Sequence, residues 1–163
     1  MSEYLKKAAV EIGKNRTEII DRLVKLSQTD MLLFWGQEKD LIVQQEKVWG
    51  PLLEWANKEI NVDFVKTQSL EVPENQTSGE KLKNYLSSFS DKELAAFYLA
   101  ALNMKSVLLA IALVKKRLNA EQAFKAAFLE ELWQAENWGM ESEAEKRRGE
   151  LKKELQEIEN FLR

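Results

Sequence analysis

The sequence predicts an all-α fold: an irregular orthogonal bundle of about seven helices, with one short extended segment near residues 62–72. Three observations favour this class. Apolar residues recur at spacings of three, four and seven along most of the 163 residues. Only two Pro and six Gly interrupt these patterns. Residues with β character are concentrated in one stretch, 61–73, which supplies the extended segment.

The composition excludes several classes of function. The chain carries 24 Lys+Arg against 27 Asp+Glu, a net charge of −3, and it has no His and no Cys. Without Cys there is no disulfide, thiol nucleophile or iron–sulfur site, and without His the commonest general base and metal ligand is missing. A balanced charge is also unlike that of a nucleic-acid-binding protein. We therefore expect no metal site and no nucleic-acid partner.

The N-terminal half reads as two long helical stretches. One apolar stripe covers residues 5–26, and Gly13–Asn15 bends or splits it. Residues 31–35 are too few for a typical helix and indicate a buried connection or a short helical turn. A second stripe covers residues 41–56, where Pro51 either kinks the helix or begins a new one.

The C-terminal half begins with a short helix over residues 81–89. Ser90 and Glu93 then form a capping-box pattern before the apolar run 94–114. Lys105 stands near the centre of that run, which favours two buried helices with a break near residues 104–106 over a membrane span.

The last two helices follow without another strand pattern. Asn119 caps a helix that continues to Trp138 and ends at Gly139. Residues 141–162 form a charged helix with a narrow apolar seam, which typically packs on one neighbouring helix, either the N-terminal helix of this chain or a partner protein.

Glu131 is the residue whose position needs an explanation. On a wheel of one continuous helix over residues 120–138, it falls in the middle of the apolar stripe. A carboxylate there must be hydrogen-bonded, paired or protonated. Our hypothesis is that it approaches Lys105, the single charge inside the run 94–114. The Arg147–Arg148 pair alternates with Glu and is interpreted as a solvated face.

Three readings of Glu131 remain open at this point. It forms a structural ion pair, it lines a groove that receives a partner group, or it is a general base. No acid shares its face one turn away, so nothing in the pattern supports carboxylate-pair catalysis.

The chain has five Trp, many for its length. We expect Trp35, Trp49 and Trp55 to pack in the core. Trp133 lies opposite the apolar stripe of the wheel. It is therefore either covered by another helix or exposed for a partner, and the sequence favours neither.

The stretch Leu129–Gly139, LEELWQAENWG, resembles a signature of the ATP synthase F1 assembly chaperones that act on the alpha subunit. Their helix carries L-E-E-x-aromatic-Q followed by a W-G stop. Four further blocks agree in order and spacing over about residues 17–148: Thr29–Leu32, Trp49–Trp55, Lys105-Ser106 and Arg117-Leu118.

This resemblance implies a chaperone without enzymatic activity or cofactor. It would bind the unassembled alpha subunit and shield the surface that the beta subunit later occupies. In the family, the acid that matches Glu131 is regarded as functionally important. We accordingly expect the partner-binding residues to be Glu131, Trp133, Gln134, Trp138 and Lys105.

The chain also departs from the family pattern. Members usually carry a β-rich domain before the helical region, whereas we expect residues 1–163 to form a single helical domain without it. Leu132 stands where the family often has a third acid, and the chain has no His to match one branch. The alternative function is therefore a helical interaction module with a different client.

The location and assembly state follow from the same reading. The first thirty residues fit neither a signal peptide nor a transit peptide. We expect a protein of the bacterial cytoplasm or the mitochondrial matrix, without stable membrane insertion, and a monomer when free of its partner.

Overall fold

The computed structural model describes residues 2–68, 76–139 and 141–163. It confirms the all-α class: the described residues contain nine α-helices and one 3-10 turn, η1 (Met31–Leu33). The helices are α1 (Ser2–Lys14), α2 (Arg16–Ser27), α3 (Lys39–Ile60), α4 (Gln76–Ser87), α5 (Asp91–Met104), α6 (Val107–Val114), α7 (Ala120–Ala127), α8 (Leu129–Trp138) and α9 (Ser142–Phe161).

The expected count of about seven was too low because two predicted helices are each split in two. The first stripe breaks at Asn15, between α1 and α2, inside the predicted Gly13–Asn15 segment. The predicted helix over 120–138 breaks at Phe128, between α7 and α8, and this break was not expected. By contrast, α3 runs unbroken through Pro51, so the alternative of a new helix there was wrong.

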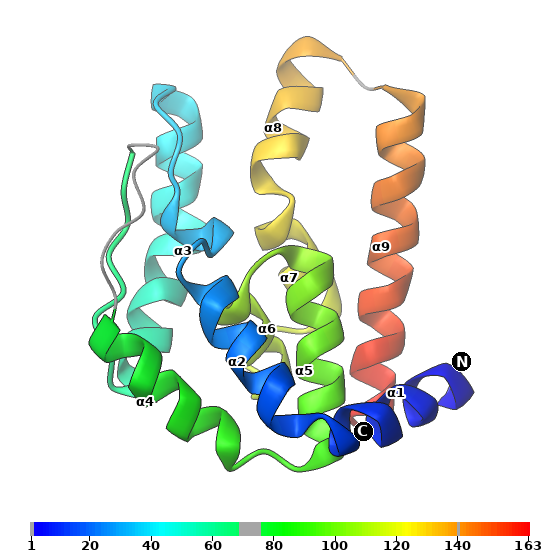
Figure 1. The fold of residues 1–163 in the computed structure, drawn as a ribbon. Helices are drawn as coiled ribbons and strands as arrows, with labels where there is room; N and C mark the ends of the chain where they lie inside the picture. Colours follow the sequence, from blue (N-terminus) through cyan, green and yellow to red (C-terminus); the bar gives the residue numbers. More distant parts are fainter. Residues whose placement is uncertain (1, 69–75, 140) are drawn as a thin grey trace.

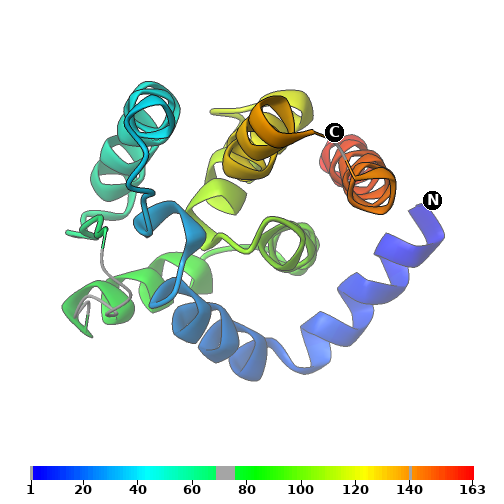
Figure 2. The same cartoon turned by 90° about the horizontal axis from the view of Figure 1, so that it is seen from above.

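The helices surround α5 and α6. Figure 2 shows α5 end-on in the centre, with α1 and α2 along one side and α3, α8 and α9 around the rest. All eight residues of α6 are buried. Burial of apolar surface is the main stabilising contribution to such a bundle, and α5 with α6 supplies its centre.

The break between α5 and α6 lies where the sequence predicts it. Lys105 adopts a left-handed conformation with φ of 56° and ends α5. Ser106 then caps α6 by accepting a hydrogen bond from the Leu109 N–H at 3.0 Å. The capping box of Ser90 and Glu93 at the start of α5 is also present.

The extended segment is only partly within the described residues, because positions 69–72 lie outside them. The described part pairs with the chain after η1 through one isolated parallel bridge between Phe34 and Thr67. The Trp35 N–H donates to the Thr67 carbonyl at 2.8 Å, and the Thr67 N–H donates to the Leu33 carbonyl at 2.7 Å.

The seam of α9 packs more widely than expected. Leu155 and Ile158 are fully buried. Helix α9 contacts the N-terminal helix α1, as one of the two alternatives predicted, but it also contacts α7 and α5, so the prediction of a single neighbouring helix was wrong. Across the described ranges, none of the helices has both the length and the hydrophobicity needed to cross a membrane.

Candidate partner-binding site

A cavity of about 420 Å³ lies between two breaks of the fold, α5–α6 and α7–α8, and the first half of α9. Figure 1 shows α8 and the first half of α9 running alongside each other. Three of the five predicted partner-binding residues, Lys105, Glu131 and Gln134, line it. Its walls also include Met31, Leu102, Asn103, Met104, Ala127, Phe128, Glu130, Arg147 and Leu151. We call this cavity the junction pocket.

Glu131 has two partners, and neither is Lys105. Its Oε1 atom accepts hydrogen bonds from Arg147 Nη2 at 2.7 Å and from Arg148 Nη1 at 3.3 Å. The predicted Glu131–Lys105 ion pair was therefore wrong, although both side chains line the same pocket. The reading of Arg147–Arg148 as a solvated face was half wrong, because the Arg148 side chain is only 6% exposed.

The break at Phe128 explains the error about Glu131. The wheel assumed one helix, whereas a new helix at Leu129 changes the direction in which Glu131 points. None of the residues of α8 is buried, and the Glu131 side chain is 36% exposed. Glu131 therefore lies at the edge of the fold, facing α9, and not inside an apolar stripe.

Trp49 holds the end of α7 at this break. Its buried indole Nε1 donates to the Ala126 carbonyl at 2.8 Å. In a continuous helix, the Glu130 N–H four residues later would occupy that carbonyl. A side chain of α3 thus provides a donor for this carbonyl at the point where α7 ends.

The sequence analysis did not single out Asp30, which positions one wall of the pocket. Its fully buried carboxylate accepts hydrogen bonds from the Leu32 N–H at 2.9 Å, the Ser106 hydroxyl at 2.6 Å and the Leu108 N–H at 2.9 Å. The Met31 N–H next to it donates to the Lys105 carbonyl at 3.1 Å. Met31 and Lys105 are thereby fixed together at the pocket wall.

Burial raises the pKa of Asp30 to about 6, while the bonds from Ser106, Leu108 and Leu32 act in the opposite direction. A signal for this contact was present in the sequence. The Thr29–Leu32 and Lys105-Ser106 blocks were both noted in the resemblance, and the structure brings them into direct contact.

The remaining two predicted residues, Trp133 and Trp138, do not line the junction pocket. Their rings pack edge to face, with centroids 5.4 Å apart, and Trp138 is 71% exposed. They form an aromatic surface from the middle of α8 to its C-terminal end. Trp35 and Trp49 are buried, and Trp55 is partly buried against the core, as expected.

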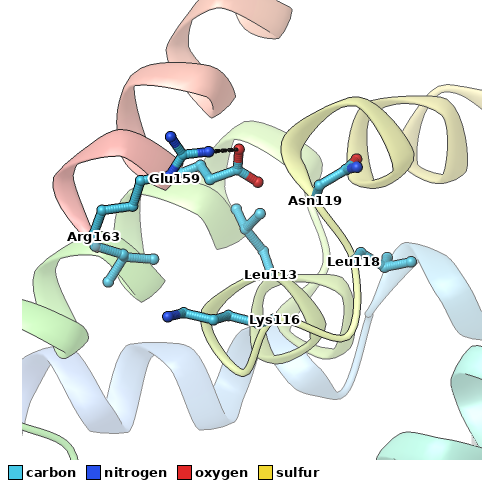
Figure 3. A pocket seen from close by; sticks show the side chains of 7 residues that line it. Leu113, Lys116, Leu118, Asn119, Glu159 and Arg163 are labelled. Carbon is cyan, nitrogen blue, oxygen red and sulfur yellow. Dashed lines mark ion pairs between the residues drawn. The ribbon is translucent and has the colours of Figure 1, made fainter.

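A second cavity, of about 250 Å³, lies at the start of α7 and the end of α9 (Figure 3). Its acid, Glu159, accepts a hydrogen bond from the Ala120 N–H at 2.7 Å and pairs with Arg163 at 3.5 Å. Glu159 thus satisfies a helix N-terminus. Within the described part of the chain, no group of three or more Asp or Glu is arranged to hold a metal ion.

This chain is similar to known proteins both in sequence and in structure. No family model matches the sequence. A curated relative, the mitochondrial protein atp12 of Schizosaccharomyces pombe, is 26% identical over 138 residues. The aligned region covers 79% of this chain but 47% of that protein. The chain thus spans about half the length of this relative.

Solved structures match almost the whole chain. Atp12 from Paracoccus denitrificans superposes with a TM-score of 0.91 at 24% identity, covering 98% of this chain and 70% of its own. The chain resembles the Atp12 family of ATP synthase assembly factors. The resemblance proposed from the sequence blocks is thus confirmed.

A third protein has the same fold. The Atu1473 protein of Agrobacterium tumefaciens, described as a candidate chaperone, superposes with a TM-score of 0.85 at 23% identity. This match covers 94% of the present chain and 59% of that one.

Proposed function

We propose that this chain is a chaperone for assembly of the ATP synthase F1 sector. It binds the unassembled alpha subunit and shields the surface that the beta subunit later occupies. It acts without catalysis or cofactor, as a monomer until it binds, in the bacterial cytoplasm or the mitochondrial matrix. The joint likeness to Atp12 in sequence and fold supports this proposal.

The surface around α8 has the composition that such a role needs. An unassembled subunit exposes apolar interface that aggregates unless it is covered. Interfaces are anchored by aromatic and Arg side chains around an apolar centre. Helix α8 offers Trp133 at its middle and Trp138 at its C-terminal end, and its first turn borders the largely apolar junction pocket.

Glu131 joins the two parts of this surface. It lies in the first turn of α8 and holds Arg147 and Arg148 of α9. In this position its carboxylate orients α8 against α9 and stays partly open to a partner. The structural and partner-binding readings of Glu131 are therefore compatible.

The test is co-expression with an alpha subunit, with and without beta, followed by size-exclusion chromatography. We expect a stable complex with alpha that beta displaces. E131K should weaken that complex by about tenfold or more, because it removes a charge at the interface. The matched control is E157K, an exposed glutamate on the second half of α9, away from α8 and the junction pocket. Thermal unfolding of each variant shows whether it remains folded.

An alternative follows from the extent of the match. The chain covers less than half of its fission yeast relative, so this helical region could serve a different client. In that case, folded wild-type chain forms no complex with alpha but captures another protein at the same surface. E131K would then weaken that second complex.

A further inference from the structure

The junction pocket contains one buried polar atom that no group in the described chain satisfies. Asn103 is 9% exposed, and its Nδ2 donates to the Leu151 carbonyl at 3.2 Å. Its Oδ1 has no hydrogen-bond partner. The orientation of this amide is fixed, because a flipped amide would set Oδ1 against the Leu151 carbonyl oxygen. An N–H or O–H donor is therefore missing beside the pocket.

The neighbouring cation is also available. The exposed side chain of Lys105 lines the pocket, and its ammonium group forms no ion pair with any described residue. The opposing acid, Glu131, is already shared by Arg147 and Arg148. The left-handed backbone of Lys105 would suit a glycine better, so a structural role alone does not require a lysine there.

The N-terminus of α8 adds a partial positive charge to that of Lys105. Ala127, Phe128, Glu130 and Glu131 place the start of the helix at the pocket. Among the residues that the structure describes, no side chain caps this helix start, because the residue before α8 is Phe128. A helix N-terminus favours a nearby negative charge, for which Glu130 and Glu131 of its own first turn are only partial compensation. Arg147 and Lys105 flank the same opening.

We propose that the junction pocket, as part of the client site proposed above, takes a short non-helical segment of a partner protein in which an apolar side chain lies beside an Asp or Glu. The carboxylate pairs with Lys105. The apolar side chain packs between Met104, Phe128 and Leu151. A backbone N–H of the segment, free because the segment is not helical, donates to Asn103 Oδ1. Because Asn103 Oδ1 is buried, the side chains that line the pocket have to move before the N–H of the segment can reach it.

The probes are two capped hexapeptides of leucine and glycine that differ at one central position, glutamate or lysine. Amide chemical shifts of the labelled full chain report where each binds. We expect the glutamate peptide to shift residues 103–105 and 128–131, and the lysine peptide to leave them unchanged. Equal shifts with both peptides, none with either, or the same shifts with sodium acetate alone would overturn the proposal.

Two variants complete the test. K105E should weaken binding of the glutamate peptide by about tenfold, because it replaces an attractive charge with a repulsive one. The matched control is K116E, an exposed lysine with the same left-handed backbone, φ 62°, beyond the other end of α6 and outside the lining of the junction pocket. N103L should also lower affinity yet leave thermal stability unchanged or raised, because it removes an unsatisfied acceptor and the Leu151 carbonyl keeps its bond within α9.

The two proposals fail in different ways. If the glutamate peptide binds as described but the chain captures no alpha subunit, the chemistry of the pocket stands and the client is wrong. If the alpha subunit binds equally well to wild type, K105E and N103L, the chaperone proposal stands and this one is wrong.

Discussion

At the residue scale, Asp30 shows how one buried charge fixes the geometry of a surface. Its carboxylate bonds to η1 and to the N-terminus of α6, two segments 76 residues apart in the chain. Three donors and the positive end of α6 compensate part of the cost of burial. The remaining cost raises the pKa of Asp30 to about 6.

This shift predicts a pH dependence of stability. The folded pKa lies above the unfolded value of 3.8, so the folded state favours the protonated acid. The contribution of Asp30 to the free energy of unfolding is greatest below pH 4 and is lost as the pH rises through 6. Between pH 4 and pH 7 the loss is on the order of 2 kcal/mol.

Denaturant unfolding of wild type and D30N at both pH values measures this loss. D30N is destabilised at every pH, because its amide nitrogen faces a backbone N–H, but it lacks the titration. The difference in the free energy of unfolding between wild type and D30N should therefore be smaller at pH 7 than at pH 4. A gap independent of pH would contradict the assignment.

Glu131 makes a second prediction at this scale. A double-mutant cycle between E131Q and R148M should give a coupling of about 1 kcal/mol in the free energy of unfolding, because the almost fully buried guanidinium of Arg148 relies on a carboxylate that is itself 36% exposed. The same cycle between E131Q and K105M should give a coupling near zero. Strong coupling to Lys105 would show that the pair predicted from the sequence forms in solution.

At the scale of elements, the break between α7 and α8 decides the site. Phe128 is not a helix breaker, and the apolar pattern continues through it without a change of period. At the break, the Ala126 carbonyl accepts a hydrogen bond from Trp49, which lies 77 residues away in the chain. A wheel drawn from local sequence could not contain that information.

W49F tests this role. It removes the bond to Ala126 and some buried volume, and should cost about 2–4 kcal/mol of unfolding free energy. W55F is the matched control. Because Trp55 is only partly buried, this substitution should lower the free energy of unfolding by less than 1 kcal/mol. Urea unfolding measures both. Equal costs would mean that the Trp49 hydrogen bond does not hold the break.

Breaks encoded locally were predictable, and breaks made by distant contacts were not. Lys105 and Ser106 interrupt an apolar run with polar residues and a cap, so the α5–α6 break was visible in the sequence. The same holds for the capping box at Ser90. Glu131 stands out in the sequence as an acid that needs a partner, but its partners come from α9, whose direction depends on tertiary packing.

At the scale of the whole molecule, burial is distributed unevenly. All of α6 is buried, whereas α8 has no buried residue among its ten. Helix α8 nevertheless carries two Trp and borders the junction pocket. A segment with little burial opens more easily, and it gains most from being covered by a partner.

The proposed client, the alpha subunit, covers α8 and the junction pocket. Amide hydrogen exchange of the chain, free and in complex with the alpha subunit, tests it most directly. In the free chain, α8 should exchange faster than α5 and α6. Binding should slow exchange at residues 102–105 and 128–138 most strongly. Protection confined to other helices, with these residues unchanged, would contradict the account.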